Sequence, residues 1–175
     1  MRVLVVGISG AGKSVLAERI AAAHGLPRIE LDAYFWGPDW TPFGRDAMRA
    51  SVGAAIAAPG WVADGYYVSQ VGDLLWPRAT HLVWLDYPRR IIMARVIRRS
   101  LLRAATRRPL WNGNRERWSA LLTADHPIRY AWRNALPRRA AIEARLALPE
   151  HAHLVVHRLR HPWEAVALAL TDAPG

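Results

Sequence analysis

The sequence predicts an α/β fold built on a mainly parallel sheet of five strands. Short apolar segments alternate with segments of helical periodicity along the 175 residues, and this alternation is typical of a parallel sheet with helices on both faces. The length, together with a hydrophobic share of 52%, suits a single globular domain over residues 1–175 with a full-sized core.

The expected strands are short and mostly apolar. Residues 2–6 form a β-branched run that Gly7 closes, which is typical of a buried strand followed by a tight turn. The remaining strands are expected at 28–31, 61–63, 81–85 and 153–159.

Helical periodicity begins near Gly12 and stops at Gly25 and Pro27. Further helices are expected at about 88–102, at 114–122 with Asn114 as N-cap, and at 162–170. Arg129 and Arg133 lie one turn apart on another predicted helix. Two stretches interrupt the regular pattern, an aromatic one at 32–59 and a basic loop at 106–114.

Composition excludes several classes of site. The chain has no cysteine, so disulfides, thiolate zinc sites and cysteine nucleophiles are ruled out, and an intracellular, cytoplasmic location is expected. Only four apolar residues precede Gly7, too few for a signal peptide, and no uncharged apolar run could span a bilayer. We therefore expect no membrane association.

The formal net charge is +10, from 24 basic and 14 acidic residues. Residues 89–145 contain 15 arginines against three acidic residues, so this segment alone has a surplus of 12. Such a segment attracts polyanions, among them nucleotide phosphates and nucleic acid. Arginine also replaces lysine throughout the chain, which explains part of the pattern as compositional bias. The one lysine is Lys13.

The segment from Gly7 to Ser14 reads Gly-Ile-Ser-Gly-Ala-Gly-Lys-Ser and matches the P-loop pattern. Glycines let backbone amides approach a polyphosphate, the lysine reaches the β- and γ-phosphates, and the serine hydroxyl binds Mg²⁺. The motif thus predicts ATP and Mg²⁺ as ligands. The residues expected to bind them are Gly7, Ser9, Gly10, Ala11, Gly12, Lys13 and Ser14.

With these motifs the chain resembles adenylate-kinase-like P-loop kinases, in particular the bacterial group called topology modulation proteins. The resemblance rests on the P-loop and on segments 29–36, 61–67, 83–88, 95–99, 112–116 and 128–132. It implies a three-layer P-loop NTPase fold, an acceptor flap at about 32–60 and a basic, lid-like segment at about 99–133. It also implies that Asp64 and Gly65 lie beside the phosphates. Tyr66 departs from the Asn of close relatives.

Asp32 and Asp64 each follow an apolar strand, so both should lie at the carboxyl edge of the sheet, where open α/β folds bind ligands. By resemblance, Asp64 orients Mg²⁺ through water together with Ser14, and Asp32 contacts the acceptor and can take its proton. Each could instead be a helix cap or turn residue. Asp86 is expected to be a turn former or cap.

Basic residues form the other candidate group. By resemblance, lid arginines clamp the transferred phosphoryl group, and we assign this role to Arg95, Arg99 and Arg129, with Arg98, Arg103 and Arg133 as further candidates. Taken singly, each arginine could be a solvated surface charge.

Aromatic residues and histidines complete the candidates. Tyr34, Phe35, Trp36, Trp40 and Phe43 form a cluster that either stacks a planar acceptor or packs on the core. His151 and His153 are expected to be structural.

The predicted function is transfer of the γ-phosphoryl group of Mg-ATP to a small acceptor, either a nucleotide or a metabolite. A nucleotide-gated nucleic-acid-binding protein that uses segment 89–145 is the alternative, and a P-loop scaffold with nucleotide as a structural ligand is a third interpretation. The motifs do not define the acceptor.

Overall fold

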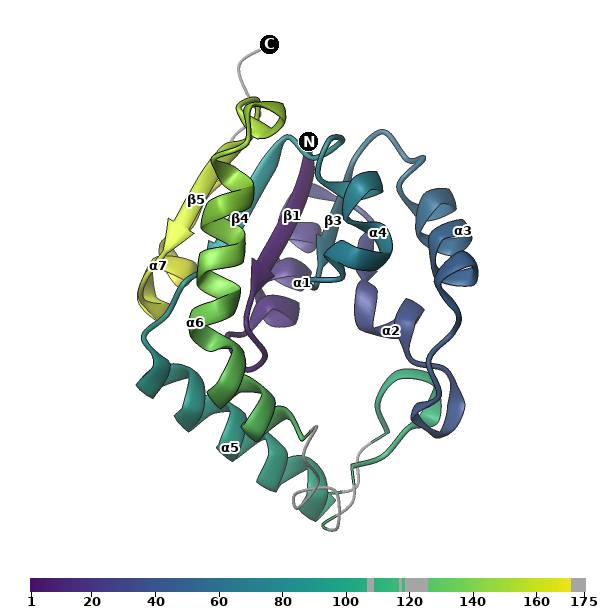
Figure 1. Ribbon diagram of the computed structural model, residues 1–175, viewed down its shortest axis with the longest axis vertical. Helices are drawn as coiled ribbons and strands as arrows, with labels where there is room; N and C mark the ends of the chain where they lie inside the picture. The colour runs from purple at the N-terminus through teal and green to yellow at the C-terminus, as the bar shows by residue number, and fades with distance from the viewer. Residues whose placement is uncertain (107–108, 117, 119–125, 171–175) are drawn as a thin grey trace.

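The computed structural model describes residues 1–106, 109–116, 118 and 126–170, which build an α/β fold around one sheet (Figure 1). The strands are β1 (Arg2–Gly7), β2 (Arg28–Glu30), β3 (Trp61–Asp64), β4 (His81–Leu85) and β5 (Val155–Leu159). They lie in the order β2-β3-β1-β4-β5, and all neighbours pair in parallel. The predicted five-stranded sheet is confirmed, and its described strands are wholly rather than mainly parallel.

Alternation along β1 divides the apolar residues between two cores. Val3 and Val5 face one core, which α1 (Lys13–His24), α5 (Arg89–Thr106) and α7 (Pro162–Ala167) cover. Leu4 and Val6 face the other, which α3 (Arg45–Ala55) and α4 (Val68–Leu75) cover. Helices therefore cover both faces of the sheet in three layers, as parallel strands buried on both sides require.

Helix α6 (Pro127–Leu146) links the two layers of helices. Its N-terminal half contributes Ala131 to the first core, and its C-terminal half contributes Ile142 to the second. In Figure 1 it passes in front of β4, and its N-terminal end lies beside α5.

Several strands and helices begin or end at other residues than predicted. Strand β5 begins at Val155 rather than at residue 153, because Pro149–His151 forms a 3₁₀ turn before it. Strand β2 ends at Glu30, since α2 (Leu31–Phe35) starts at once. The helix predicted at 88–102 continues to Thr106, whereas the one predicted at 162–170 ends at Ala167.

The helix predicted at 114–122 lies mostly outside the described residues. Asn114, expected as its N-cap, instead follows the 3₁₀ turn Trp111–Gly113 in extended conformation. Its side chain binds another segment of the chain.

All carboxyl ends of the strands lie at one edge of the sheet. Helix α2 and the 3₁₀ turn Pro38–Trp40 lie at this edge on one side, and α5 lies on the other. This edge is where an α/β fold places its ligands. Within the described part of the chain, no helix has the length and apolar character needed to cross a bilayer.

Candidate active site

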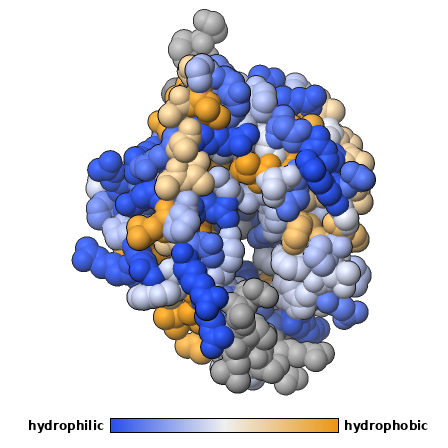
Figure 2. Space-filling view, viewed as in Figure 1, coloured by the Kyte–Doolittle hydropathy of each residue, from blue (hydrophilic) through white to orange (hydrophobic). Residues whose placement is uncertain are grey.

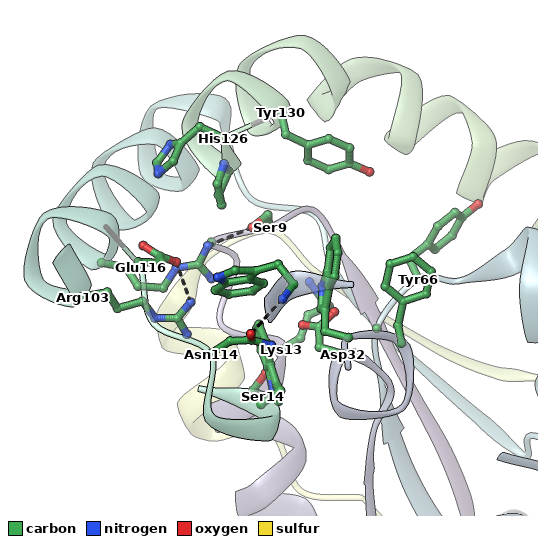
Figure 3. A pocket seen from close by; sticks show the side chains of 18 of the residues that line it. Ser9, Lys13, Ser14, Asp32, Tyr66, Arg103, Asn114, Glu116, His126 and Tyr130 are labelled. Atoms are coloured by element: carbon green, nitrogen blue, oxygen red, sulfur yellow. Dashed lines mark hydrogen bonds and ion pairs between the residues drawn. The ribbon is translucent and has the colours of Figure 1, made fainter. Parts of the chain in front are cut away.

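A cavity of about 1790 Å³ opens at the carboxyl edge of the sheet. Its walls come from the loop after β1, the segment around α2, the end of β3, α5, residues 111–116 and the cavity-facing side of α6. In the space-filling view an opening separates α6 from the lobe that contains α2 (Figure 2). Figure 3 shows the polar side chains that project into the cavity.

The glycine-rich loop forms the floor of the cavity, because all residues from Gly7 to Ser14 except Ala11 line it. Gly7 has a φ of 150° and Gly10 a φ of 86°, conformations that L side chains rarely adopt. A Cβ atom on Gly7 would lie 2.9 Å from the Leu85 carbonyl oxygen, and one on Gly10 would lie 2.9 Å from the Val96 Cβ. Glycine therefore lets this loop pack closely against β4 and α5. Ala11 is buried beneath it.

Lys13 begins α1 and reaches back over the loop. Its Nζ donates a hydrogen bond to the Ile8 carbonyl oxygen at 3.2 Å. Burial lowers the pKa of Lys13, and the nearby carboxylates Asp32 and Asp64 partly oppose this shift. The ammonium group thus has a neutral hydrogen-bond partner and lies in an environment that disfavours its charge.

Two of the predicted lid arginines bind the loop directly. Arg95 Nη1 donates to the Ala11 carbonyl oxygen at 3.1 Å, and Arg99 Nη2 donates to the Ser9 hydroxyl at 2.9 Å. Burial, and then the neighbouring Arg103, lower the pKa of Arg99. Helix α5 therefore places two guanidinium groups against the glycine-rich loop.

The other predicted arginines lie elsewhere. Arg98, Arg129 and Arg133 are exposed and do not line the cavity. Arg103 does line it, but it forms an ion pair with Glu116 at 3.2 Å. The position of Arg129 therefore gives no support to the phosphate contact predicted for it.

Arg138 lines the cavity but was not predicted. Its guanidinium lies over the Tyr66 ring, 3.8 Å from the centroid, and donates a hydrogen bond to the Tyr130 hydroxyl. In the sequence it stands in the run Pro-Arg-Arg within a helix, where no feature distinguishes it from an exposed surface arginine. The Tyr66 ring thus supports the Arg138 guanidinium at the cavity.

Asp64 and Ser14 lie together, as the sequence predicted. Asp64 ends β3 beside Val5 of β1, is 2% exposed, lies near the Ser14 hydroxyl, and its carboxylate accepts a hydrogen bond from Arg28 Nε. Burial raises the pKa of Asp64, while these two partners lower it. Among the described residues, no group of three His, Cys, Asp or Glu could hold a metal. One hydroxyl and one carboxylate suit Mg²⁺, which takes few protein ligands and keeps phosphate oxygens and water.

Asp32 lies on α2 and lines the cavity. Its carboxylate accepts a 2.5 Å hydrogen bond from the Tyr67 hydroxyl. Burial, followed by the Asp32 charge, raises the pKa of Tyr67, so this tyrosine stays a donor. The hydrogen bond fixes the carboxylate within the cavity.

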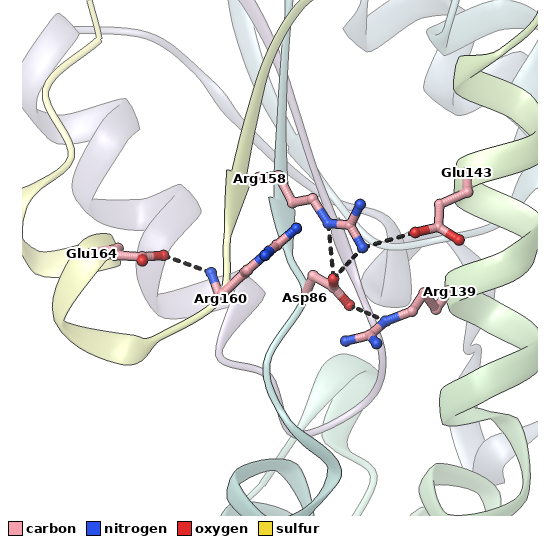
Figure 4. A network of polar contacts seen from close by, with 6 residues as sticks. All are labelled: Asp86, Arg139, Glu143, Arg158, Arg160 and Glu164. Atoms are coloured by element: carbon pink, nitrogen blue, oxygen red, sulfur yellow. Dashed lines mark hydrogen bonds and ion pairs between the residues drawn. The ribbon is translucent and has the colours of Figure 1, made fainter.

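Asp86 is not part of the cavity. Its carboxylate accepts hydrogen bonds from Arg139 at 2.6 Å and from Arg158 at 2.8 and 2.6 Å, and Arg158 also pairs with Glu143 (Figure 4). This network ties α6 to β4 and β5. Asp86 does follow a strand, but its main contacts are these ion pairs rather than those of a cap.

Only part of the predicted aromatic cluster lines the cavity. Phe35, Trp36 and Trp40 line the cavity, whereas Tyr34 packs on the core and Phe43 is 42% exposed. Trp111, which was not predicted, extends the aromatic lining from the opposite loop.

Of the histidines, His151 packs against Trp76 and His153 is exposed, in keeping with structural roles. His126, which the sequence did not single out, lines the cavity and is 3% exposed. Its Nδ1 accepts a hydrogen bond from the Ile128 amide and so caps α6, and burial lowers its pKa.

No protein-family model matches the chain, and no curated protein is significantly similar to it. The chemistry of the cavity is therefore inferred from its geometry and charge.

Proposed function

We propose that the protein is an adenylate-kinase-like P-loop kinase that transfers the γ-phosphoryl group of Mg-ATP to a hydroxyl group of a small acceptor. The observation that carries this proposal is the convergence of one lysine and three arginines without ion-pair partners on a glycine-rich loop that follows a buried parallel strand.

Several other arginines are paired with carboxylates. Arg28, Arg49, Arg103, Arg139 and Arg158 each lie within 4 Å of a carboxylate. Within the described part of the chain, Arg95, Arg99 and Arg138 have no such partner, and all three line the cavity with Lys13. Four cations without a direct ion pair in one site favour a polyanion such as a triphosphate, because charge interactions strengthen as water is excluded.

The residues present also fit Mg²⁺. Ser14 and Asp64 would hold it on the side of the loop nearest β3, and the bound ion would neutralise charge on the phosphate oxygens. The loop keeps its position only with glycine at residues 7 and 10, since side chains there would collide with β4 or α5 and displace it.

In the proposed reaction, the acceptor hydroxyl oxygen forms a bond to the γ-phosphorus, and the bond from that phosphorus to the β–γ bridging oxygen breaks. ADP leaves with that electron pair, and Asp32 accepts the hydroxyl proton. Lys13, Arg95 and Arg99 stabilise the charge that spreads over the phosphoryl oxygens. Positioning and electrostatics of this kind account for most catalysis of phosphoryl transfer.

A nucleic-acid-binding role is the second candidate, because Arg98 and Arg133 are exposed outside the cavity. The arginines at the loop do not favour it, since they lie in a cavity rather than on an open face.

Measurement of ADP release tests the proposal. The protein is incubated with Mg-ATP and a panel of hydroxyl-bearing metabolites and nucleotides, with an acceptor-free reaction as background. We expect at least one acceptor to raise ADP release well above background. Tight DNA or RNA binding with no acceptor-dependent release would contradict the proposal and support the second candidate.

A further inference from the structure

If the proposed function holds, the aromatic end of the cavity identifies the acceptor class. We infer that the acceptor is an uncharged alcohol with a planar aromatic ring, as in a nucleoside, and that the ring stacks on a tryptophan wall formed by Trp36, Trp40 and Trp111.

These three tryptophans are not part of the hydrophobic core. Trp61, Trp76 and Trp84 are at most 2% exposed and belong to the core beneath the sheet. The residues of the tryptophan wall are half-buried and line the cavity. Large aromatic surface that faces a cavity is costly to leave hydrated, so a ligand that covers it gains binding energy.

The rings meet edge to face. Trp36 and Trp40 are 5.7 Å apart at 80°, and Trp40 and Trp111 are 6.2 Å apart at 81°. An edge-to-face contact covers a face of one ring but only the edge of the other, so ring faces remain for a planar ligand.

Two asparagines hold the tryptophan wall in place. The Asn114 side chain is buried, accepts a hydrogen bond from the Trp40 amide at 2.8 Å and donates to the Gly37 carbonyl oxygen at 2.8 Å. Asn112 Nδ2 donates to the Trp36 carbonyl oxygen. Segments 74 to 77 residues apart are thereby joined, and a surface assembled before binding saves the ligand the cost of ordering it.

Charge at the tryptophan wall argues against an anionic acceptor. Arg103 lies 5.7 Å from the Trp111 ring but is paired with Glu116. Asp32 and Asp39 line the same end of the cavity. The Arg103 guanidinium beside the tryptophan wall is therefore already neutralised by Glu116, and two carboxylates face the same end of the cavity, which disfavours a phosphate on the acceptor there.

Asp32 links the tryptophan wall to the reaction. It lies on α2, which Trp36 directly follows, and the Trp36 amide donates to the Asp32 carbonyl oxygen. An acceptor whose ring stacks on the tryptophan wall therefore has its hydroxyl group near the Asp32 carboxylate, which accepts the proton. The hydroxyl oxygen forms a bond to the γ-phosphorus, the bond from that phosphorus to the β–γ bridging oxygen breaks, and ADP leaves with its electron pair.

The test compares planar alcohols with their charged or non-planar counterparts. Adenosine, guanosine, cytidine, uridine and pyridoxine are the planar probes, and the four 5′-monophosphates and ribose are the comparison set. Binding is followed by calorimetry with Mg-ADP present, and turnover by ADP release from Mg-ATP. We expect at least one planar probe to show a higher kcat/KM than its monophosphate and than ribose.

Trp40→Leu should weaken binding of that probe by about tenfold or more, because loss of one stacking ring typically has an effect of this size. Trp40→Phe, which keeps a planar ring, should stay near the wild-type affinity. Trp163→Leu is the matched control, since Trp163 is exposed on α7 and outside the cavity. Affinity for Mg-ATP alone should be the same in all three variants.

The outcomes separate the two proposals. If the wild-type protein fails to bind Mg-ATP, the proposed function fails. If Mg-ATP binds but no planar probe does, or a monophosphate or ribose is the better acceptor, the inferred acceptor class is overturned, while ADP release with the wider acceptor panel decides the kinase assignment separately. An unchanged affinity in a folded Trp40→Leu variant would also overturn it.

Discussion

Arg99 Nη2 donates a hydrogen bond to the Ser9 hydroxyl across 2.9 Å, joining two residues 90 positions apart. Ser9 lies at the tip of the glycine-rich loop, and Arg99 lies in the middle of α5. The bond fixes a half-buried guanidinium against the loop that we propose binds the triphosphate.

Replacement of Arg99 by Ala should lower turnover by about 10²–10³-fold, because one donor aimed at developing charge is lost. Arg99→Lys should restore little, since an ammonium cannot reproduce the planar fork of arginine. Arg98→Ala is the matched control on the exposed side of α5. Equal losses at Arg98 and Arg99 in acceptor-dependent ADP release would contradict the assignment.

Asp32→Asn and Asp64→Asn should affect different properties. The Asp32 variant should bind Mg-ATP normally and lose turnover by about 10²-fold or more, because it loses the proton acceptor. The Asp64 variant should need more Mg²⁺ for the same nucleotide affinity, because Ser14 loses its charged neighbour. Mg²⁺ titrations of ADP binding and of turnover distinguish them. Full turnover in Asp32→Asn would remove Asp32 from the mechanism.

Asp86 should matter for stability rather than chemistry. Asp86→Ala leaves the Arg139 guanidinium without its carboxylate and should lower the free energy of unfolding by about 2 kcal/mol. Asp73→Ala, which removes a 61% exposed carboxylate from Arg49, should have a much smaller effect. Urea unfolding measures both. A loss in Asp86→Ala no larger than that in Asp73→Ala would show that the network does not stabilise α6 on the sheet.

The affinity for nucleotide should fall at alkaline pH, and the fall should begin at a lower pH than the one at which an ordinary lysine loses its proton. Burial lowers the pKa of Lys13, so its ammonium group is lost below the usual value of about 10.4. In that pH window the unfolded chain binds more protons than the folded one, so stability rises with pH while affinity for the anion falls. Dissociation constants of Mg-ADP from pH 7 to 10 test this. The decline should be absent in Lys13→Arg, and a wild-type profile flat to pH 10 would contradict it.

Much of the sheet could be predicted because its signals are local. Residues 81–85 form the predicted strand without change, and Gly7 closes β1 as expected. Boundaries shifted where a competing local structure began, as at Leu31, which starts a helix directly after β2. The bounds of α4 were not predicted, because its eight residues contain a glycine and show too short a pattern.

The site residues in the glycine-rich loop could be predicted from the sequence, whereas several residues of the surrounding cavity could not. Lys13, Ser14 and Asp64 lie together because a contiguous motif and a strand end fix their places. Arg138 could not be separated from fourteen other arginines of segment 89–145, since its role depends on Tyr66, far away in sequence. Asn114 looked like a helix cap because asparagine suits both a cap and a cross-link between loops.

The central claim is that residues 7–14 bind the phosphates of Mg-ATP, and the thermal shift produced by Mg-ATP tests it most directly. Wild-type protein should gain several degrees at saturating nucleotide, because a ligand that binds only the folded state stabilises it. Lys13→Ala should fold normally yet show almost no shift, since Lys13 is the only lysine in the chain and its ammonium group lies over the loop, hydrogen-bonded to the Ile8 carbonyl oxygen. A Lys13→Ala variant with an unchanged shift and an unchanged affinity for ATP would contradict the account.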